Sequence, residues 1–317
     1  MIPTNRPSLL NKIVLMSLGI LVILLGSIFF FITSEKVTND GSQAYATYEV
    51  IEQDSLFPQI IFIDRDVVIG EYFDFVDSLV TAWEPYLAYT LSEHLLVHAN
   101  PWIIDTLTNT DYYRMMAKDS FVYDQKELHV LRAGDTLKIP SQKEAEELKQ
   151  FLDALRLDIN IPEYKLRIFG KDSLLYTFPI RVGQNKEKYL AMGNRLTDLR
   201  TITGIGTIVR HAKDPDFYNP VTHQPFYTTK RDDGRRTMMP QIPWIETEIN
   251  GIRYGQMIHP TTNPETLEEA YSNGCIGTRE ADAWVIYYHA PLGTAINIRY
   301  DLLLENGDML SDIYHLN

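Results

Sequence analysis

Short apolar strands dominate the C-terminal half of the chain, and this pattern limits the fold most strongly. From Tyr164, the segments Y-K-L-R-I-F and L-L-Y-T-F-P-I-R-V flank the turn G-K-D-S, as in a β-hairpin. Further strand candidates, separated by Gly, Pro, Asn and Asp, are T-I-T-G-I-G-T-I-V, W-I-E-T-E-I, R-Y-G-Q-M-I-H and T-A-I-N-I-R-Y. Only R-E-A-D-A-W-V-I-Y-Y-H, after Thr278, indicates a helix. We therefore expect a mainly β / α+β fold.

A capping box marks a helix in front of these strands. Ser141 is followed three residues later by Glu144, and the apolar residues after them share one helical face as far as Leu155. This pattern predicts a linking helix over residues 141–158. It would separate a mixed, aromatic-rich N-terminal domain of unknown role (48–140) from a C-terminal β domain (159–317).

A charge-free apolar stretch runs from Ile13 to Ile32, close to the ~20 residues that cross a bilayer as a helix. Basic residues precede it and mostly acidic residues follow it, so the positive-inside rule predicts a cytoplasmic tail (1–12), a transmembrane anchor (13–32) and a tether (33–47). The expected location is the inner (cytoplasmic) membrane, single-pass, with the C-terminal domain in the periplasm or outside the cell. A cleaved signal peptide is the alternative, but the triplet Ala44-Tyr45-Ala46 lies well past the apolar end.

Composition excludes several classes of protein. The net charge of -13 argues against nucleic acid as a partner, because such binding needs a basic surface. The chain has one cysteine, which excludes an intramolecular disulfide and a metal site built from several thiolates. His211 and His223, with nearby aspartates, match no ligand spacing. We expect neither a metal nor a cofactor.

The single cysteine, Cys275, lies in Y-S-N-G-C-I-G. A free cysteine is often only a small buried hydrophobe, but Asn273-Gly274 is turn chemistry, and Thr278 is placed to cap the next helix. A loop entering a helix offers free N–H groups and a positive helix end, which would favour a thiolate.

His259 lies 16 residues before Cys275, at the end of a strand candidate, and could act as its base. The alternative for His259 is an ordinary exposed or hydrogen-bonded loop histidine.

The segment from His259 to Gly277, H-P-T-T-N-P-E-T-L-E-E-A-Y-S-N-G-C-I-G, resembles the signature of the L,D-transpeptidases, the YkuD family. That family carries His, a short gap, and then [S/T]-H-G-C-[hydrophobic]-[R/N]. The resemblance covers roughly residues 159–300. Two departures adjoin the cysteine: Asn273 replaces the usual histidine, and Gly277 replaces the usual arginine or asparagine. In the family that arginine helps to anchor the substrate peptide, so Arg279 or Arg253 is the candidate substitute here.

The resemblance implies that Cys275 attacks the meso-diaminopimelate carbonyl of a peptidoglycan tetrapeptide stem and expels D-alanine, with His259 carrying the proton. Backbone N–H groups of Asn273, Gly274 and Cys275 would hold the oxyanion, and Ser272 would position the turn. The acyl group would pass to a second stem (3-3 cross-linking), a D-amino acid, water or a protein lysine. The alternatives are a catalytically degenerate peptidoglycan-binding member and an L,D-carboxypeptidase or hydrolase of the same fold.

A long insert from Ala212 to Arg236 is rich in proline and aromatic residues. It is either a lid over the cleft or an ordinary surface loop.

Overall fold

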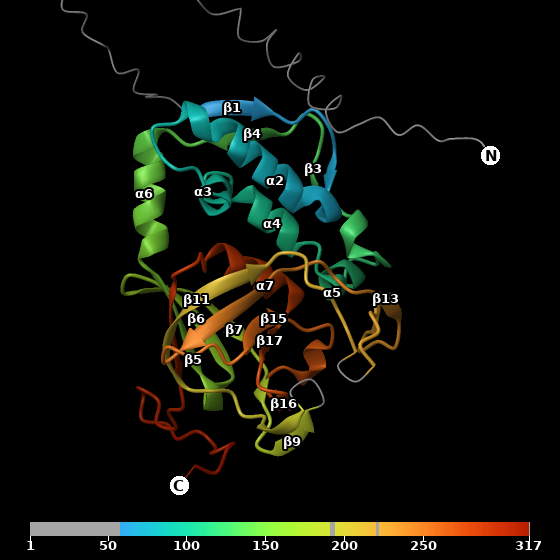
Figure 1. Ribbon diagram of the computed structural model, residues 1–317, viewed down its shortest axis with the longest axis vertical. Helices are drawn as coiled ribbons and strands as arrows, with labels where there is room; N and C mark the ends of the chain where they lie inside the picture. Colours follow the sequence, from blue (N-terminus) through green and yellow to red (C-terminus); the bar gives the residue numbers. More distant parts are fainter. Residues whose placement is uncertain (1–57, 191–193, 220–221, 317) are drawn as a thin grey trace, which may run out of the picture. The chain divides into compact units, whose positions relative to one another are not determined.

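The computed structural model describes residues 58–190, 194–219 and 222–316, which all belong to one compact unit, Gln53–Asn317. Its C-terminal half is built on an eight-stranded mixed sheet (Figure 1). In spatial order the strands are β17 (Ile276–Thr278), β15 (Met257–Pro260), β14 (Trp244–Ile249), β11 (Gly204–Ala212), β18 (Ala295–Arg299), β5 (Leu155–Asn160), β6 (Lys165–Gly170) and β7 (Ser173–Pro179). Adjacent strands run antiparallel except the pairs β15/β17 and β18/β5, which are parallel.

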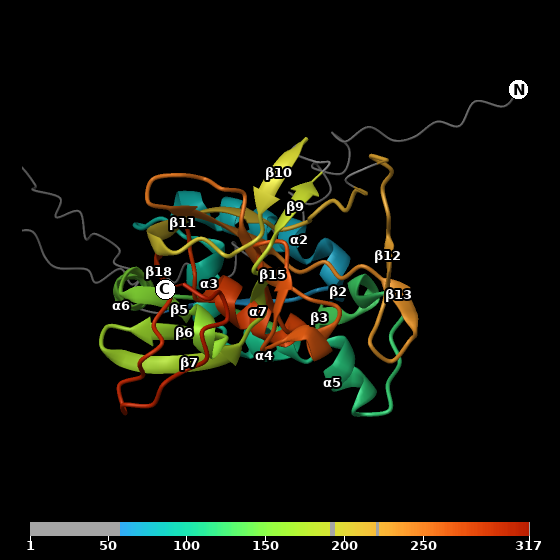
Figure 2. The same ribbon diagram turned by 90° about the horizontal axis from the view of Figure 1, so that it is seen from below.

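Three small two-stranded sheets decorate this half. They pair β8 (Val182–Gly183) with β16 (Ala270–Ser272), β9 (Glu187–Leu190) with β10 (Arg195–Asp198), and β12 (Thr228–Lys230) with β13 (Arg236–Met238). Figure 2 shows the β9–β10 hairpin standing out from the sheet. The mainly β / α+β fold expected from the strand pattern is therefore confirmed.

The region before residue 141 is mainly helical. Its elements are β1 (Gln59–Phe62), β2 (Val67–Val68), α2 (Ile69–Trp83), α3 (Glu93–His98), α4 (Trp102–Thr108), α5 (Tyr112–Met116), β3 (His129–Leu131) and β4 (Thr136–Ile139). β1 pairs with β4, and β2 pairs with β3. Single 3-10 turns lie at Glu84–Tyr86, Gln125–Glu127, Ile161–Glu163 and Pro264–Thr266.

Helix α7 (Glu280–Tyr288) joins the two regions, and every residue in it except Val285 is buried. It contacts α3 and α4 as well as β15, which explains why it is buried on nearly all sides rather than along one stripe (Figure 1). Phe73 of α2 stacks on Trp284 with ring centroids 6.0 Å apart, and the Tyr72 and Tyr288 hydroxyls are hydrogen-bonded at 2.7 Å. One hydrophobic core thus runs through both regions.

A buried polar cluster, which we call the histidine cluster, lies at this junction and comprises His94, His98, His211 and His289. His94 stacks on His211 with ring centroids 5.5 Å apart, and His98 meets His289 edge-on at 4.9 Å. Beside them the buried carboxylate of Glu93 accepts hydrogen bonds from the hydroxyls of Tyr287 and Tyr288 and pairs with Lys213.

The predicted capping box is present, but the helix it opens is shorter than expected. The Ser141 side chain accepts from the Glu144 amide, and the Glu144 carboxylate accepts from the Ser141 amide. This helix, α6 (Gln142–Asp153), ends five residues before the predicted position 158. Residues 155–160 form β5 instead, because Leu155, Leu157 and Ile159 all face the core as alternate residues of a strand. The division into domains at 48–140, 141–158 and 159–317 remains a prediction.

The cytoplasmic tail (1–12), anchor (13–32) and tether (33–47) lie outside the described residues. Across the segments 58–190, 194–219 and 222–316, no helix is sufficiently long and apolar for a membrane span.

Candidate active site

Cys275 lies between β16 and β17, in a turn held by Ser272. The Ser272 hydroxyl donates to the Cys275 carbonyl at 2.5 Å and accepts from the Gly274 amide at 3.1 Å. Gly274 has φ +114, and a Cβ there would lie 2.9 Å from the Gln256 side chain, so the turn requires glycine. One of the three amides expected to hold an oxyanion, that of Gly274, is thus occupied by Ser272 in this structure.

The surroundings of the thiol differ from the expectation. Strand β17 separates Cys275 from α7, whose N-cap is Arg279 rather than Thr278, and the Thr278 hydroxyl bonds the Arg279 carbonyl instead. The predicted helix end is therefore not adjacent to the sulfur. Burial raises the pKa of the Cys275 thiol, while a backbone hydrogen bond from Met257 and the charge of Arg181 act in the opposite direction. Burial thus opposes the thiolate that the sequence favoured, and a neighbouring base would help to remove the thiol proton.

His259 lies on β15, and in the parallel β15/β17 pair its register partner is Gly277, two residues after Cys275. Its Nδ1 lies 2.8 Å from the Pro260 carbonyl, which fixes the proton on Nδ1 and leaves the Nε2 lone pair free. Burial lowers the pKa of His259 to about 4; Arg181 adds to this effect, whereas the Pro260 hydrogen bond opposes it. The ring is therefore neutral at pH 7, the form that can accept a proton.

Aromatic rings connect His259 to the insert that begins at Ala212. Trp244 stacks on the imidazole with ring centroids 4.3 Å apart, Phe217 contacts Trp244 at 5.9 Å, and Phe226 contacts Phe217 at 5.8 Å. The insert is therefore linked to His259 through the side chain of Trp244. Whether it also acts as a lid remains a prediction.

Both predicted substitutes for the family arginine pair with carboxylates rather than with the cysteine. Arg253 bonds Glu246, at 2.9 Å from its Nη2, and Arg210 shares the same carboxylate. Arg279 is exposed and lies 3.8 Å from Asp282.

The cation whose charge lowers the pKa of the Cys275 thiol is instead Arg181. The sequence analysis did not identify this residue. It lies between β7 and β8 and forms a two-hydrogen-bond backbone bridge with Gly277, at 2.9 and 3.0 Å. The only local signal was an arginine within the apolar run F-P-I-R-V.

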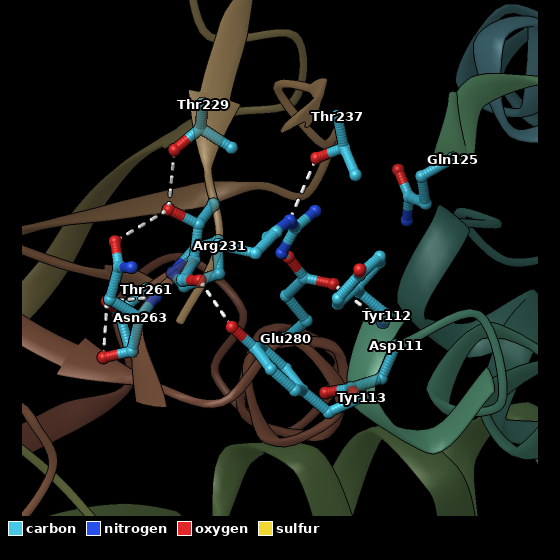
Figure 3. A network of polar contacts seen from close by, with 12 residues as sticks. Asp111, Tyr112, Tyr113, Gln125, Thr229, Arg231, Thr237, Thr261, Asn263 and Glu280 are labelled. Carbon is cyan, nitrogen blue, oxygen red and sulfur yellow. Dashed lines mark hydrogen bonds and ion pairs between the residues drawn. The ribbon is translucent and has the colours of Figure 1, made fainter. Parts of the chain in front are cut away.

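A network of polar contacts fixes the loop after His259 to the N-terminal region (Figure 3). The Tyr113 hydroxyl donates to the Thr262 carbonyl at 3.0 Å and accepts from the Asp232 amide at 2.9 Å. Asn263 in turn donates to the Asp232 carboxylate at 2.8 Å. Helix α5 thus ties together the insert and the segment that follows the candidate base.

A buried ion pair between Arg231 and Glu280 lies at the centre of this network (Figure 3). Glu280 also accepts from the Tyr112 amide at 3.0 Å, and Arg231 donates to Thr237 at 2.8 Å and lies over the Tyr112 ring. The residues of the network come from α5, the insert and the start of α7. Burial raises the pKa of Glu280, against the opposing charge of Arg231.

Comparison with known proteins shows which family this part of the chain resembles. Residues 154–298 match the family model of YkuD, the L,D-transpeptidase catalytic domain. The resemblance to the YkuD family expected over residues 159–300 is therefore confirmed by this match. The match leaves residues 58–153 outside it.

Solved L,D-transpeptidases are among the structural neighbours. An L,D-transpeptidase from Mycobacterium smegmatis aligns at 14% identity and TM-score 0.31, covering 46% of this chain and 58% of that one. One from Mycobacterium tuberculosis H37Rv aligns at 14% identity and TM-score 0.29, covering 46% and 57%. The catalytic domain of the E. faecium L,D-transpeptidase aligns at 13% identity and TM-score 0.30, covering 46% and 98%. The chain thus spans less than two thirds of the two mycobacterial structures. No curated protein matches it.

Proposed function

We propose that this protein is a cell-wall cysteine acyltransferase, an L,D-transpeptidase that acts on peptidoglycan tetrapeptide stems through Cys275. The observation that carries the proposal is the placement of Cys275 beside β17 and of His259 on the adjacent β15, inside a YkuD-type domain. A neutral imidazole anchored through Nδ1 is suited to accept the thiol proton at Nε2.

The proposed reaction has two steps. The Cys275 sulfur bonds to the meso-diaminopimelate carbonyl carbon, and its proton passes to His259 Nε2. The amide C–N bond then breaks, D-alanine leaves with that proton, and a thioester remains. The nitrogen of an amine acceptor then bonds to the thioester carbon and gives a proton to His259. The C–S bond breaks, the product leaves, and His259 returns the proton to the Cys275 sulfur.

The amides of the turn are the candidate donors to the tetrahedral oxyanion. Asn273 and Cys275 are favoured, because Gly274 donates to Ser272. Each such donor contributes about 2.7–4 kcal/mol of transition-state stabilisation in other enzymes. Ser272 acts by holding the turn.

The acceptor defines the biological outcome. A second stem gives a 3-3 cross-link, a D-amino acid gives exchange, and a protein lysine gives anchoring. The peptidoglycan substrate requires the catalytic domain to face the periplasm or the outside of the cell, with residues 13–32 as the single-pass anchor in the inner membrane; this location is part of the proposal.

A second candidate is a catalytically degenerate member that binds peptidoglycan without turnover. It is favoured by the raised thiol pKa and by glycine at position 277. A third outcome is an L,D-carboxypeptidase or hydrolase of the same fold, in which water replaces the amine.

One assay separates the three. The full chain in mild detergent is incubated with disaccharide tetrapeptide and a D-amino acid. The products are identified by mass spectrometry, and Cys275→Ala is the control. Exchange of D-alanine that Cys275→Ala abolishes supports the transpeptidase, and loss of D-alanine without exchange indicates the hydrolase. Binding without turnover in both proteins indicates the degenerate member.

A further inference from the structure

The side chain of Arg181 occupies the space in which residue 277 would carry its own side chain. A Cβ built on Gly277 would lie 2.5 Å from Arg181 Nε, 2.7 Å from its Cγ and 3.0 Å from its Cδ. Only glycine leaves this room, because real Cβ atoms do not approach other atoms so closely. Since the backbones of Arg181 and Gly277 are also hydrogen-bonded, the Arg181 side chain packs against β17 at Gly277, two residues after Cys275.

The side chain of Arg181 is half-buried and forms no ion pair with the described residues. In the part of the chain that the structure describes, no carboxylate lies within 4.0 Å of it, and its buried Nε has no hydrogen-bond partner. Nη1 donates to the Thr266 hydroxyl at 2.9 Å, and the Tyr271 ring lies 5.9 Å from Cζ. A partly desolvated cation without a neighbouring carboxylate has a strong preference for an anion.

The other arginines weighed for this role are committed elsewhere. Arg253 is bonded to Glu246, and Arg279 lies at the start of α7 near Asp282. Arg181 is the cation whose charge lowers the pKa of the Cys275 thiol, against the larger opposing effect of burial.

We infer that Arg181 is the carboxylate-binding residue of the acyl-donor site, and that Gly277 is present because it makes room for this arginine. The inference rests on the proposed function for the identity of its ligand, the terminal D-alanine carboxylate of the donor. That carboxylate is two bonds beyond the scissile amide nitrogen, so a donor with its carbonyl at Cys275 brings it close to the sulfur. The cation that the family motif would place at position 277 is supplied from the segment between β7 and β8 that is bridged to Gly277.

The first test needs no turnover. Because Cys275 is the only cysteine, the full chain in detergent can be alkylated with iodoacetate, which carries a carboxylate, and with iodoacetamide, which does not. The ratio of the two rate constants is compared with that of N-acetylcysteine amide. We expect the ratio in the wild type to be at least fivefold higher, to fall to the model-thiol value in Arg181→Gln, and to be partly kept in Arg181→Lys.

Two further variants serve as an additional test of the inference and as its control. Gly277→Ala should lower the ratio, because the added methyl group displaces the guanidinium of Arg181. This variant retains the arginine, so it can replace Arg181→Gln if that protein does not fold. Arg65→Gln, an exposed arginine paired with Glu71, is the matched control and should leave the ratio unchanged. An iodoacetate preference that is absent in the wild type, or equal in wild type and Arg181→Gln, overturns the inference.

The second test uses turnover and separates the two proposals. In the exchange assay, Arg181→Gln should raise KM at least tenfold for a donor ending in D-alanine and leave KM unchanged for one ending in D-alaninamide. If the wild type turns over no stem but shows the alkylation preference, the transpeptidase proposal fails and the anion site stands. If turnover is normal and neither the ratio nor KM responds to Arg181→Gln, the inference fails alone.

Discussion

The imidazole of His259 stacks on the indole of Trp244, with ring centroids 4.3 Å apart and planes inclined by 20°. The stack buries one face of the candidate base, and burial is the main reason that its pKa lies at about 4. Trp244 thereby links the insert, through Phe217, to the proton-transfer step.

Removing the indole ring of Trp244 should change the pKa of His259 and the rate of catalysis. In Trp244→Ala, water reaches the imidazole, so the pKa of His259 should rise from about 4 towards the ordinary value of about 6.5. We expect kcat to fall at least tenfold, because the ring loses its fixed orientation. NMR titration of His259 and steady-state kinetics measure the two effects. Trp244→Phe keeps an aromatic face and should lie between; an unchanged titration in Trp244→Ala contradicts the role given to burial.

Tyr113 should matter for catalysis although it lies on α5, outside the YkuD match. Tyr113→Phe removes its hydrogen bonds to Thr262 and Asp232 and frees the loop after His259. We expect a three- to tenfold lower kcat and a stability loss of about 1–2 kcal/mol. The matched control is Tyr123→Phe, because Tyr123 is exposed and no partner for its hydroxyl occurs among the described residues. Equal kinetics in both variants would show that the N-terminal region does not position the site.

The Arg231–Glu280 pair should stabilise the fold only while both members are present. Their side chains are 2% and 1% exposed. Glu280→Gln leaves a buried guanidinium uncompensated and should cost about 3–5 kcal/mol of unfolding free energy, measured in urea. Glu71→Gln breaks the exposed pair with Arg65 and should cost less than about 1 kcal/mol. The double variant Arg231→Met, Glu280→Leu should recover part of the loss; a Glu280→Gln protein as stable as Glu71→Gln would exclude this account.

Acid should destabilise the protein through the histidine cluster. Burial is the largest cause that lowers the pKa of His94, His211 and His289 to about 4, and their pKa in the unfolded chain is about 6.5. Between these values the unfolded chain binds more protons, so stability is complete above about pH 6.5 and falls as the pH drops towards 4.

This pH dependence can be tested at one position. At pH 5 the buried His289 alone should cost about 2 kcal/mol relative to pH 7.5. Urea unfolding at the two pH values should show a smaller difference in His289→Gln than in the wild type. His129→Gln, at an exposed histidine, should behave as the wild type does. Stability that does not fall between pH 7.5 and pH 5 would contradict the prediction.

Local signals in the sequence predicted much of the fold. The strands β6 and β7 pair as the hairpin that was expected on either side of the turn G-K-D-S. The end of α6 was harder, because Leu155 fits both a helical face and the alternation of β5. Thr278 resembled a helix cap, but its pairing with Pro260 in the sheet takes priority.

The candidate site also contains residues that the sequence predicted and one that it did not. Cys275, His259 and Ser272 were accessible because they share one contiguous motif. Arg181 was not, because it lies 96 residues before Gly277 and reaches it only through a backbone bridge and a close contact. A glycine where a family motif carries arginine signals a lost cation in the sequence, and only the fold indicates where a replacement comes from.

A covalent bond between the donor stem and Cys275 is the central feature of the proposed mechanism. The full chain is mixed with disaccharide tetrapeptide without an amine acceptor, quenched in acid within seconds, and measured by intact mass and peptide mapping. We predict an adduct equal to the donor minus D-alanine on the peptide that contains Cys275, which disappears when a D-amino acid is added and never forms in His259→Gln or Cys275→Ala. D-alanine release that continues in Cys275→Ala would contradict the central claim, as would an adduct on any other residue.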